Sequence, residues 1–297
     1  MKRIMEKMKK FLQRGGERRM KKVTIGVLAG VVSFLFSPVA FPYLTPWYFN
    51  PWGTDFSSAI QITDHLDIQG NTFIQNDLSN GTFQEWGTFV SRSYDGGISY
   101  GSNIEITSIF SAGGNVTPTF FTFTYGNMEI YADTANFDYG TNTDPGVYGA
   151  DNGALIGQFT LLSGGGMLNN YLPVSNGMIN AVFVANWLES GYWFDALGRD
   201  LSQWTITSGS APILTLGLVT TNASVSTPNS TLINEYDEWI GLPGGSSYSN
   251  NSPSYFFVSN GGQFRVDVIP EPTSLLLIGS GLLGLAGIGI RRRRRIV

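Results

Sequence analysis

Apolar and polar residues alternate over much of residues 41–268, whereas each end of the chain carries a continuous apolar run. Ile104-Glu105-Ile106-Thr107 and Phe121-Thr122-Phe123-Thr124 place every second side chain on one face, as half-buried strands do. The alternation predicts strands at Phe56–Thr63, Thr82–Ser91, Asn103–Phe110, Thr119–Tyr125, Met128–Ala132, Ala154–Leu162, Met178–Ala185, Trp204–Thr207, Ile213–Thr220 and Tyr255–Ile269.

Glycine-rich turn signals separate these segments, among them Gly113-Gly114-Asn115, Gly164-Gly165-Gly166 and Gly261-Gly262. Gly126-Asn127, between two predicted strands, indicates a tight hairpin. Many strands joined by such turns predict a mostly β chain with a single antiparallel β-sandwich or jelly-roll-like domain over residues 41–268. We expect an N-terminal signal helix and a C-terminal transmembrane helix on either side of it.

Residues 1–40 have the three parts of a secretory signal peptide. Residues 1–22 contain ten lysines and arginines, Val23–Phe36 is an apolar run of fourteen residues, and small residues follow up to Ala40. This order predicts export with cleavage after Ala40, and the alternative is an uncleaved N-terminal anchor. The aromatic and proline-rich segment Phe41–Trp52 either crosses the β domain as an extended strap or forms a tether.

Residues 269–297 indicate a membrane stop. The run Thr273–Ile290 holds 18 residues without a charge, and as a helix it is about 27 Å long, close to the hydrocarbon thickness of a bilayer. Before it stands Pro270-Glu271-Pro272, whose prolines favour an extended, accessible backbone. After it come five arginines that favour the cytoplasmic side: Arg291, Arg292, Arg293, Arg294 and Arg295.

The order and spacing of these parts from Val268 to Arg295 resemble the PEP-CTERM sorting signal of exopolysaccharide-producing Gram-negative bacteria. The resemblance implies that an exosortase, a membrane-embedded cysteine transpeptidase, recognises the chain and cuts it near Pro270–Pro272. It also implies a precursor held transiently in the inner membrane, then a product at the cell surface or in the extracellular matrix. The alternative is an ordinary C-terminal tail anchor, which needs no Pro-Glu-Pro segment.

Parts of the middle of the chain are similar to flocculation-associated members of the same group. The similar stretches are Asn80–Gly87, Phe123–Asp133 and Phe159–Gly166. This resemblance implies a role in holding cells together within secreted polysaccharide, as in a biofilm or floc.

Charge is segregated along the chain. Residues 41–268 contain three arginines, no lysine and nineteen acids, a net charge of −16. Such a domain repels nucleic acid and anionic membrane surfaces, which require positive charge. The chain also lacks cysteine, which excludes disulfides, thiol catalysis and cysteine-bound metals.

Candidate catalytic residues are sparse. The single histidine, His65, lies between Asp64 and Asp67 and could act as a general base, but a surface position near a strand end is the favoured interpretation. No Gly-x-Ser-x-Gly motif accompanies it. Two aromatic and acidic clusters could bind or hydrolyse sugar, but solvated loop charges next to core aromatic residues are the favoured interpretation. These clusters are Glu235, Asp237 and Glu238 near Trp239, and Glu189 and Asp195 flanking Tyr192-Trp193.

Calcium is the metal that the available oxygen ligands would suit, through Asp133, Asp138, Asp144 and Asp151. Their spacing fits no EF-hand, and a polar solvated loop is the simpler interpretation, so we predict no required cofactor. Together these features predict a non-enzymatic structural or adhesive surface protein that contacts an exosortase, the inner membrane and exopolysaccharide. The alternative is a secreted carbohydrate-binding or glycoside-hydrolysing protein.

Overall fold

The computed structural model describes residues 46–269, except residues 102, 136, 143–145, 175–177 and 210–211. Eight long strands form its main body: β3 (Leu66–Asp77), β4 (Thr82–Tyr94), β6 (Glu105–Val116), β7 (Phe120–Asp133), β8 (Ala154–Asn169), β10 (Ile179–Leu188), β12 (Ile213–Thr220) and β14 (Tyr255–Ile269). The shorter elements are β1 (Trp47–Phe49), η1 (Phe56–Ser58), β2 (Ile60–Ile62), β5 (Ile98–Ser99), β9 (Leu172–Pro173), β11 (Trp193–Phe194), η2 (Leu201–Gln203), β13 (Ser224–Ser226), α2 (Ser230–Ile240) and η3 (Gly245–Ser247).

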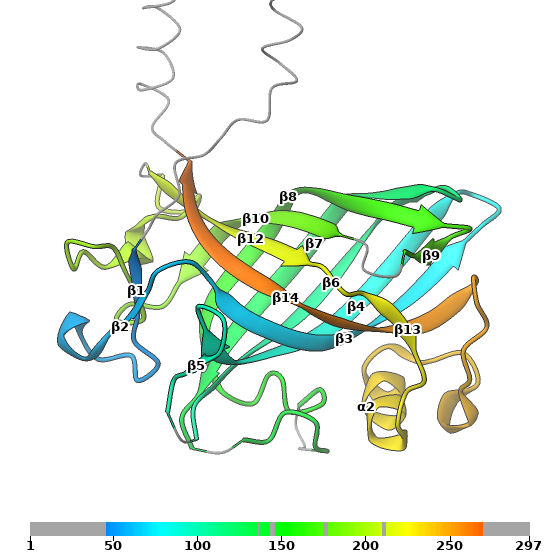
Figure 1. Cartoon of the computed structure of the whole chain (residues 1–297), viewed down its shortest axis with the longest axis horizontal. Helices are drawn as coiled ribbons and strands as arrows, with labels where there is room; N and C mark the ends of the chain where they lie inside the picture. The colour runs from blue at the N-terminus through cyan, green and yellow to red at the C-terminus, as the bar shows by residue number, and fades with distance from the viewer. Residues whose placement is uncertain are drawn as a thin grey trace, which may run out of the picture. The chain divides into compact units, whose positions relative to one another are not determined.

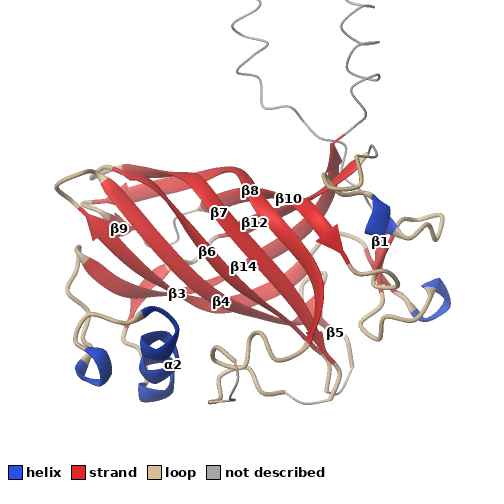
Figure 2. Ribbon diagram, turned by 180° about the vertical axis from the view of Figure 1, so that it is seen from behind, coloured by secondary structure: helices blue, strands red, loops and turns tan. Residues whose placement is uncertain are grey.

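The eight long strands form a closed antiparallel barrel in which each strand pairs with the next one in chain order (Figures 1 and 2). Strand β14 pairs with β12 on one side and returns to β3 on the other, which closes the ring. The chain is mostly β as predicted, but the predicted sandwich or jelly roll is wrong. Both architectures alternate inward and outward side chains, so alternation alone does not reveal that the first and last strands of this sheet meet.

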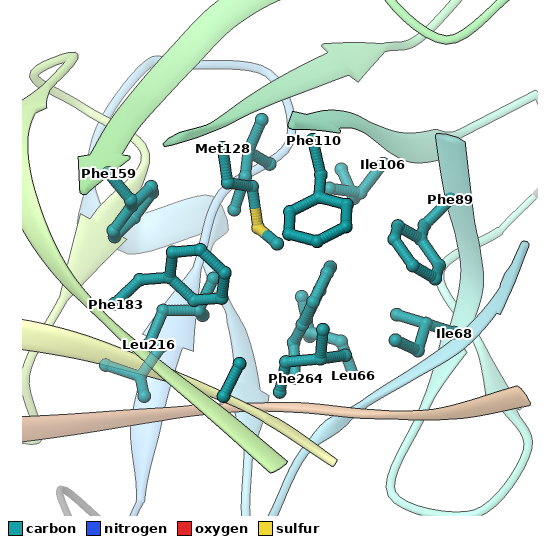
Figure 3. Packing of buried hydrophobic residues seen from close by; sticks show 14 of the residues in the cluster. Leu66, Ile68, Phe89, Ile106, Phe110, Met128, Phe159, Phe183, Leu216 and Phe264 are labelled. Carbon is teal, nitrogen blue, oxygen red and sulfur yellow. The ribbon is translucent and has the colours of Figure 1, made fainter. Parts of the chain in front are cut away.

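Apolar side chains from all eight strands fill the barrel interior (Figure 3). Each of the labelled residues in this core is at most 3% exposed: Leu66, Ile68, Phe89, Ile106, Phe110, Met128, Phe159, Phe183, Leu216 and Phe264. The interior of an eight-stranded barrel is just wide enough for side chains to fill. This section of the barrel is therefore a packed core.

Several glycine-rich segments that predict turns lie inside long strands. Gly126-Asn127 is in the middle of β7, and Gly164-Gly165-Gly166 is in β8, so the predicted hairpin and turn at these positions are wrong. Gly164 and Gly166 make room for aromatic rings, because an added Cβ atom would lie 2.9 Å from the ring of Phe123 and 2.7 Å from the ring of Phe121, respectively. From the sequence alone, glycines that let a strand pass close to an aromatic ring cannot be distinguished from glycines that form a turn.

Helix α2, which the alternation of apolar and polar residues does not predict, packs against the outside of the barrel wall. The Asn229 side chain caps its first turn by accepting from the Leu232 amide at 2.8 Å, and Gly241, with a φ of 71°, ends it. Leu232 and Tyr236 lie one turn apart and are buried in a second apolar cluster. In that cluster the Tyr236 ring lies edge-on to Phe257 of β14 at 5.1 Å.

Strands β1, β2 and β11 form a separate three-stranded sheet. Trp47 and Phe49 of β1 are fully buried and contact Trp193, with ring centroids 5.8 and 5.2 Å apart. The described residues of the aromatic and proline-rich segment, 46–52, therefore pack within the folded domain and do not form a free tether, but they do so in this small sheet and not as an extended strap.

Among the residues that the structure describes, no helix is both long enough and apolar enough to span a bilayer. The predicted signal peptide with Ala40, the sorting residues Pro270–Pro272, the apolar run Thr273–Ile290 and the five terminal arginines all lie outside the described residues.

Candidate functional site

A groove of about 1080 Å³ follows the outer face of β3 and β14, and we call it the β3–β14 groove. Its floor consists of outward-facing residues at alternate positions of the two paired strands. Three cross-strand pairs form this floor: Asn71 with Ser259, Gln69 with Gly261, and Asp67 with Gln263. The floor is therefore mainly neutral and polar.

The walls of the groove come from loops far apart in the sequence. Tyr139 and Tyr148 line one wall, and their rings meet edge-on at 5.3 Å. The Tyr139 hydroxyl donates to the Thr88 carbonyl oxygen at 2.9 Å, which fixes the ring, and burial raises the pKa of this phenol. On the other wall, Asn222 Oδ1 accepts from the Gly261 amide at 2.7 Å. Both walls are thus hydrogen-bonded to the barrel.

An ion pair at the groove also fixes the tyrosine wall. Arg92 donates from Nε and Nη2 to Glu105 Oε2 at 2.9 and 2.7 Å. The other oxygen, Oε1, accepts from the Asp138 and Tyr139 amides at 3.0 Å each. The Glu105 side chain is fully buried, and burial raises its pKa while these hydrogen bonds oppose the shift. The Arg92 charge is therefore compensated within the protein.

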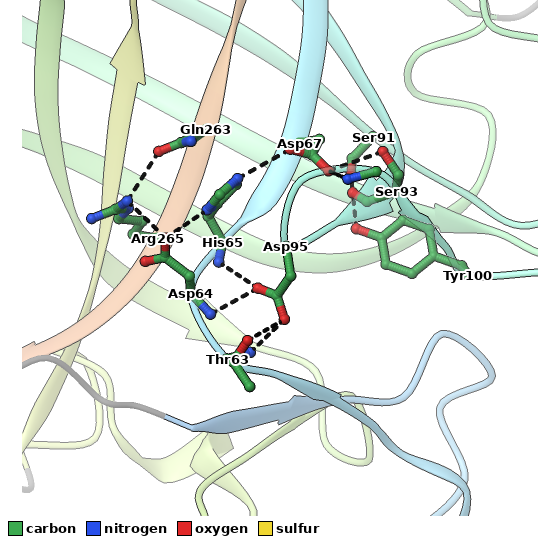
Figure 4. A network of polar contacts seen from close by, with 11 residues as sticks. Thr63, Asp64, His65, Asp67, Ser91, Ser93, Asp95, Tyr100, Gln263 and Arg265 are labelled. Carbon is green, nitrogen blue, oxygen red and sulfur yellow. Dashed lines mark hydrogen bonds and ion pairs between the residues drawn. The ribbon is translucent and has the colours of Figure 1, made fainter.

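His65 contacts Asp67, which lines the groove, and lies in a cluster of charged groups (Figure 4). Its Nδ1 is 3.0 Å from Asp64 Oδ2, and its Nε2 is 3.1 Å from Asp67 Oδ1. Asp64 Oδ2 also accepts from Arg265 Nη2 at 3.0 Å. Both histidine contacts are N–H donations only in the charged imidazolium, because neutral imidazole has a single N–H. His65 does precede β3 as predicted, but it is 7% exposed and not a surface residue.

Asp95 connects the turn before β3 with the turn after β4 (Figure 4). Its carboxylate accepts from the Thr63 amide and hydroxyl at 2.8 and 2.6 Å, and from the Asp64 and His65 amides at 2.7 and 3.1 Å. Burial works against ionisation, but these hydrogen bonds outweigh it and hold the pKa of Asp95 below its usual value. The surroundings of His65 thus join two turns, which favours a structural role over general-base catalysis.

The acids near Trp239 do not face one another across a cleft. Glu235 is buried, and its Oε2 accepts from the Tyr148 amide at 3.1 Å. Asp237 Oδ1 accepts from the Leu242 amide just beyond the end of α2, at 2.9 Å. The arrangement supports loop and helix structure rather than a sugar site.

The second acidic cluster has the same character. Asp195 is buried and pairs with Arg199, with Oδ2 and Nε 2.6 Å apart. Trp193 is also buried, and its indole N–H donates to the Ile156 carbonyl oxygen at 2.9 Å. Because this ring belongs to the core, it offers no platform for a sugar.

The described carboxylates that are predicted to bind calcium each accept a hydrogen bond from a different group of the protein. Asp138 accepts from the Asn152 amide group at 2.6 Å, Asp151 accepts from the Val147 amide at 2.5 Å, and Asp133 accepts from the Ala135 amide at 2.7 Å. Asp144 is outside the described residues. Within the described part of the chain, no three histidine, aspartate or glutamate side chains converge as metal ligands, so the calcium interpretation gains no support there.

A carboxylate that the sequence patterns do not single out lies inside the barrel. Glu85 of β4 is 5% exposed and borders a small cavity of about 20 Å³, beside Phe83, Phe121 and Phe256. Burial raises the pKa of Glu85 to about 7, and a hydrogen bond with Thr72 opposes the shift. Glu85 occupies an inward position in the alternation of β4, and that position was the only signal in the sequence.

Residues 268–295 match the family model of the PEP-CTERM protein-sorting motif. The chain therefore carries a PEP-CTERM sorting motif at residues 268–295. The resemblance predicted from Val268 to Arg295 is confirmed, and the motif marks the PEP-CTERM protein for export, exosortase processing and sorting to the cell surface from a membrane-anchored precursor. No curated protein and no solved structure matches the chain significantly. The similarity to flocculation-associated members stays a prediction.

The sorting motif begins within the last strand of the barrel wall. Val268 and Ile269, the first two residues of the match, belong to β14 and pair with Leu214 and Ile213 of β12. The strand that closes the barrel therefore leads directly into Pro270.

Proposed function

We propose that this PEP-CTERM protein is a non-enzymatic structural or adhesive component of a Gram-negative cell surface, where it holds secreted exopolysaccharide or neighbouring cells in a floc or biofilm. The observation that supports this proposal is the direct succession of a closed barrel and a sorting motif. A closed barrel presents no unpaired strand edge, so many copies can be displayed close together without edge-to-edge aggregation.

The mechanism is one of placement. Residues 1–40 direct export, Arg291–Arg295 hold the precursor in the inner membrane, and the exosortase cuts near Pro270–Pro272. The acidic body, with a net charge of −16 over residues 41–268, is then displayed outside the cell. Its charge disfavours nucleic acid as a partner.

Deletion of Pro270–Pro272 tests this function. We expect mass spectrometry to find the wild-type protein shortened at both ends, and the deletion variant to keep its C-terminal segment and remain in the inner membrane. A strain without exosortase is the control and should reproduce the phenotype of the deletion. Cells with the wild-type protein should settle faster than cells with the variant, and equal maturation, surface display and settling would refute the proposal.

A second candidate function is carbohydrate binding without surface retention, and the β3–β14 groove favours it. Glycoside hydrolysis has less support, because it requires two carboxylates across the sugar. Among the described residues that line the groove, Asp67 is the sole carboxylate, and it faces His65. Release of reducing sugar from polysaccharide by the purified protein, abolished by Asp67→Asn, would favour hydrolysis instead.

A further inference from the structure

We propose that the β3–β14 groove binds a stretch of uncharged polysaccharide. This inference rests on the proposed adhesive function and names the class of ligand for it. The groove, at about 1080 Å³, slightly exceeds the range of small-molecule pockets, which is roughly 300–1,000 Å³. A segment of a polymer suits that size better than a single small molecule does.

The charges of the groove disfavour an anionic ligand. Its described lining contains two formally charged side chains, Asp67 and Arg92. Asp67 is 3.1 Å from His65 Nε2, and its second oxygen accepts from the Ser93 hydroxyl and the Gly97 amide at 3.0 and 2.8 Å. Arg92 is paired with buried Glu105. Since Arg92 is the sole cation of the described lining and is already paired, the lining offers no free cation for a phosphate or a uronate.

The polar groups that remain are neutral and point outward. Gln69 and Ser259 are exposed, and neither side chain has a hydrogen-bond partner among the described residues. They come from paired strands, and outward positions repeat about every 7 Å along each strand. A row of amide and hydroxyl groups at this spacing can form repeated hydrogen bonds with the hydroxyls of a linear glycan.

The wall adds an apolar surface to this row. Tyr139 is partly exposed, and its hydroxyl is held by Thr88, so its ring orientation is fixed before a ligand arrives. An aromatic ring with a fixed orientation offers its face to the C–H groups of a sugar ring at little entropic cost. A groove with hydroxyl-binding groups on its floor and an aromatic ring in its wall suits a sugar chain.

An extended peptide fits this groove less well. Peptides that bind alongside strands add to a free sheet edge through their main chain. Strand β3 pairs with β4 and β14, so its backbone groups are already used. A peptide would have to bind through side chains alone.

Two exposed glutamines on the same strand, one in the groove and one outside it, provide a matched test. Gln69 and Gln75 both lie on β3 and are both exposed, but Gln75 is outside the groove. The assay is affinity electrophoresis of the full-length protein in detergent, in native gels containing dextran, galactomannan or hydroxyethyl cellulose. Parallel gels contain alginate, a polyanion, or a casein peptide mixture.

We expect at least one of the three neutral polymers to retard the wild-type protein, and neither alginate nor the peptides to do so. Gln69→Trp, which fills the groove, should weaken binding by at least about tenfold, and Gln69→Ala by about threefold to tenfold, the loss of one or two hydrogen bonds. Gln75→Trp and Gln75→Ala should bind like wild type. Thermal unfolding of each variant shows whether the barrel remains folded.

Three results would overturn the proposal: no retardation by any neutral polymer, equal effects at the two positions in folded variants, or retardation by alginate or peptide alone. These outcomes are independent of C-terminal processing. A protein that fails in the gels but is still cut and displayed refutes the groove assignment only. A protein that binds but is never cut refutes the proposed sorting.

Discussion

Replacement of Glu85 by glutamine should remove a pH-dependent loss of stability. Glu85 is buried inside the barrel, and burial raises its pKa from 4.5 to about 7. Between these values the folded protein keeps the proton while the unfolded chain has lost it, so stability falls as the pH rises. A shift of that size corresponds to about 3 kcal/mol above pH 7, since one pKa unit is about 1.4 kcal/mol.

The assay is urea unfolding followed by tryptophan fluorescence between pH 4 and 8. The free energy of unfolding of Glu85→Gln should be close to that of wild type at pH 4 and up to about 3 kcal/mol higher at pH 8. Tyr236 is a titratable group near Glu85, and burial raises its pKa well above this range. Glu238→Gln is the control, because Glu238 is exposed on α2, and it should show no such pH dependence.

The result that contradicts this reasoning is a difference between Glu85→Gln and wild type that stays constant from pH 4 to 8. A Glu85 carboxyl titration with its midpoint near 4.5, measured by ¹³C NMR, would contradict it as well. Either result would mean that water or a rearranged partner solvates the carboxylate inside the barrel.

Three further predictions concern the core and the turns. Phe183→Ala should lower the free energy of unfolding by about 3–5 kcal/mol because the ring is fully buried, whereas Leu197→Ala, at a side chain 78% exposed, should change it little in the same denaturation assay. Asp95→Ala should lower the melting temperature, with a loss of about 1–3 kcal/mol, because the backbone amides it binds lose their acceptor; an unchanged melting temperature would contradict the role of Asp95. Ser79→Ala should raise the pKa of Asp77 from about 2 towards 3.8, since the Ser79 side-chain hydrogen bond is the main cause of the lowered pKa; carboxyl NMR would show a shift, and no shift would exclude that cause.

Much of the barrel wall could be predicted from alternation alone. The predicted strand Ile213–Thr220 coincides with β12, and Tyr255–Ile269 coincides with β14. Most inward positions of these strands carry large apolar residues, such as Leu214, Leu216, Phe256 and Phe264, which gives a clear signal. Strand β3 escapes prediction because Gly70, Thr72 and Asn76 occupy buried positions on it, where apolar residues would be expected.

Closure of the barrel and the position of the groove could not be predicted in the same way. Closure depends on the pairing of β14 with β3, strands separated by most of the domain, and no local pattern records that contact. The groove combines residues from five segments of the chain, represented by Gln69, Val90, Tyr139, Asn222 and Ser259. The sorting motif, by contrast, is contiguous in the chain, so its parts and their spacing can be recognised from the sequence.

The shared residues Val268 and Ile269 have a mechanical consequence. Gln263 on the groove floor and Ile269 lie six residues apart on the same strand, about 20 Å along its axis. Tension between a polymer in the groove and an attachment at the processed end would run lengthwise through β14. Eight residue pairs with β12 and ten with β3 would then share the load in shear rather than opening one after another.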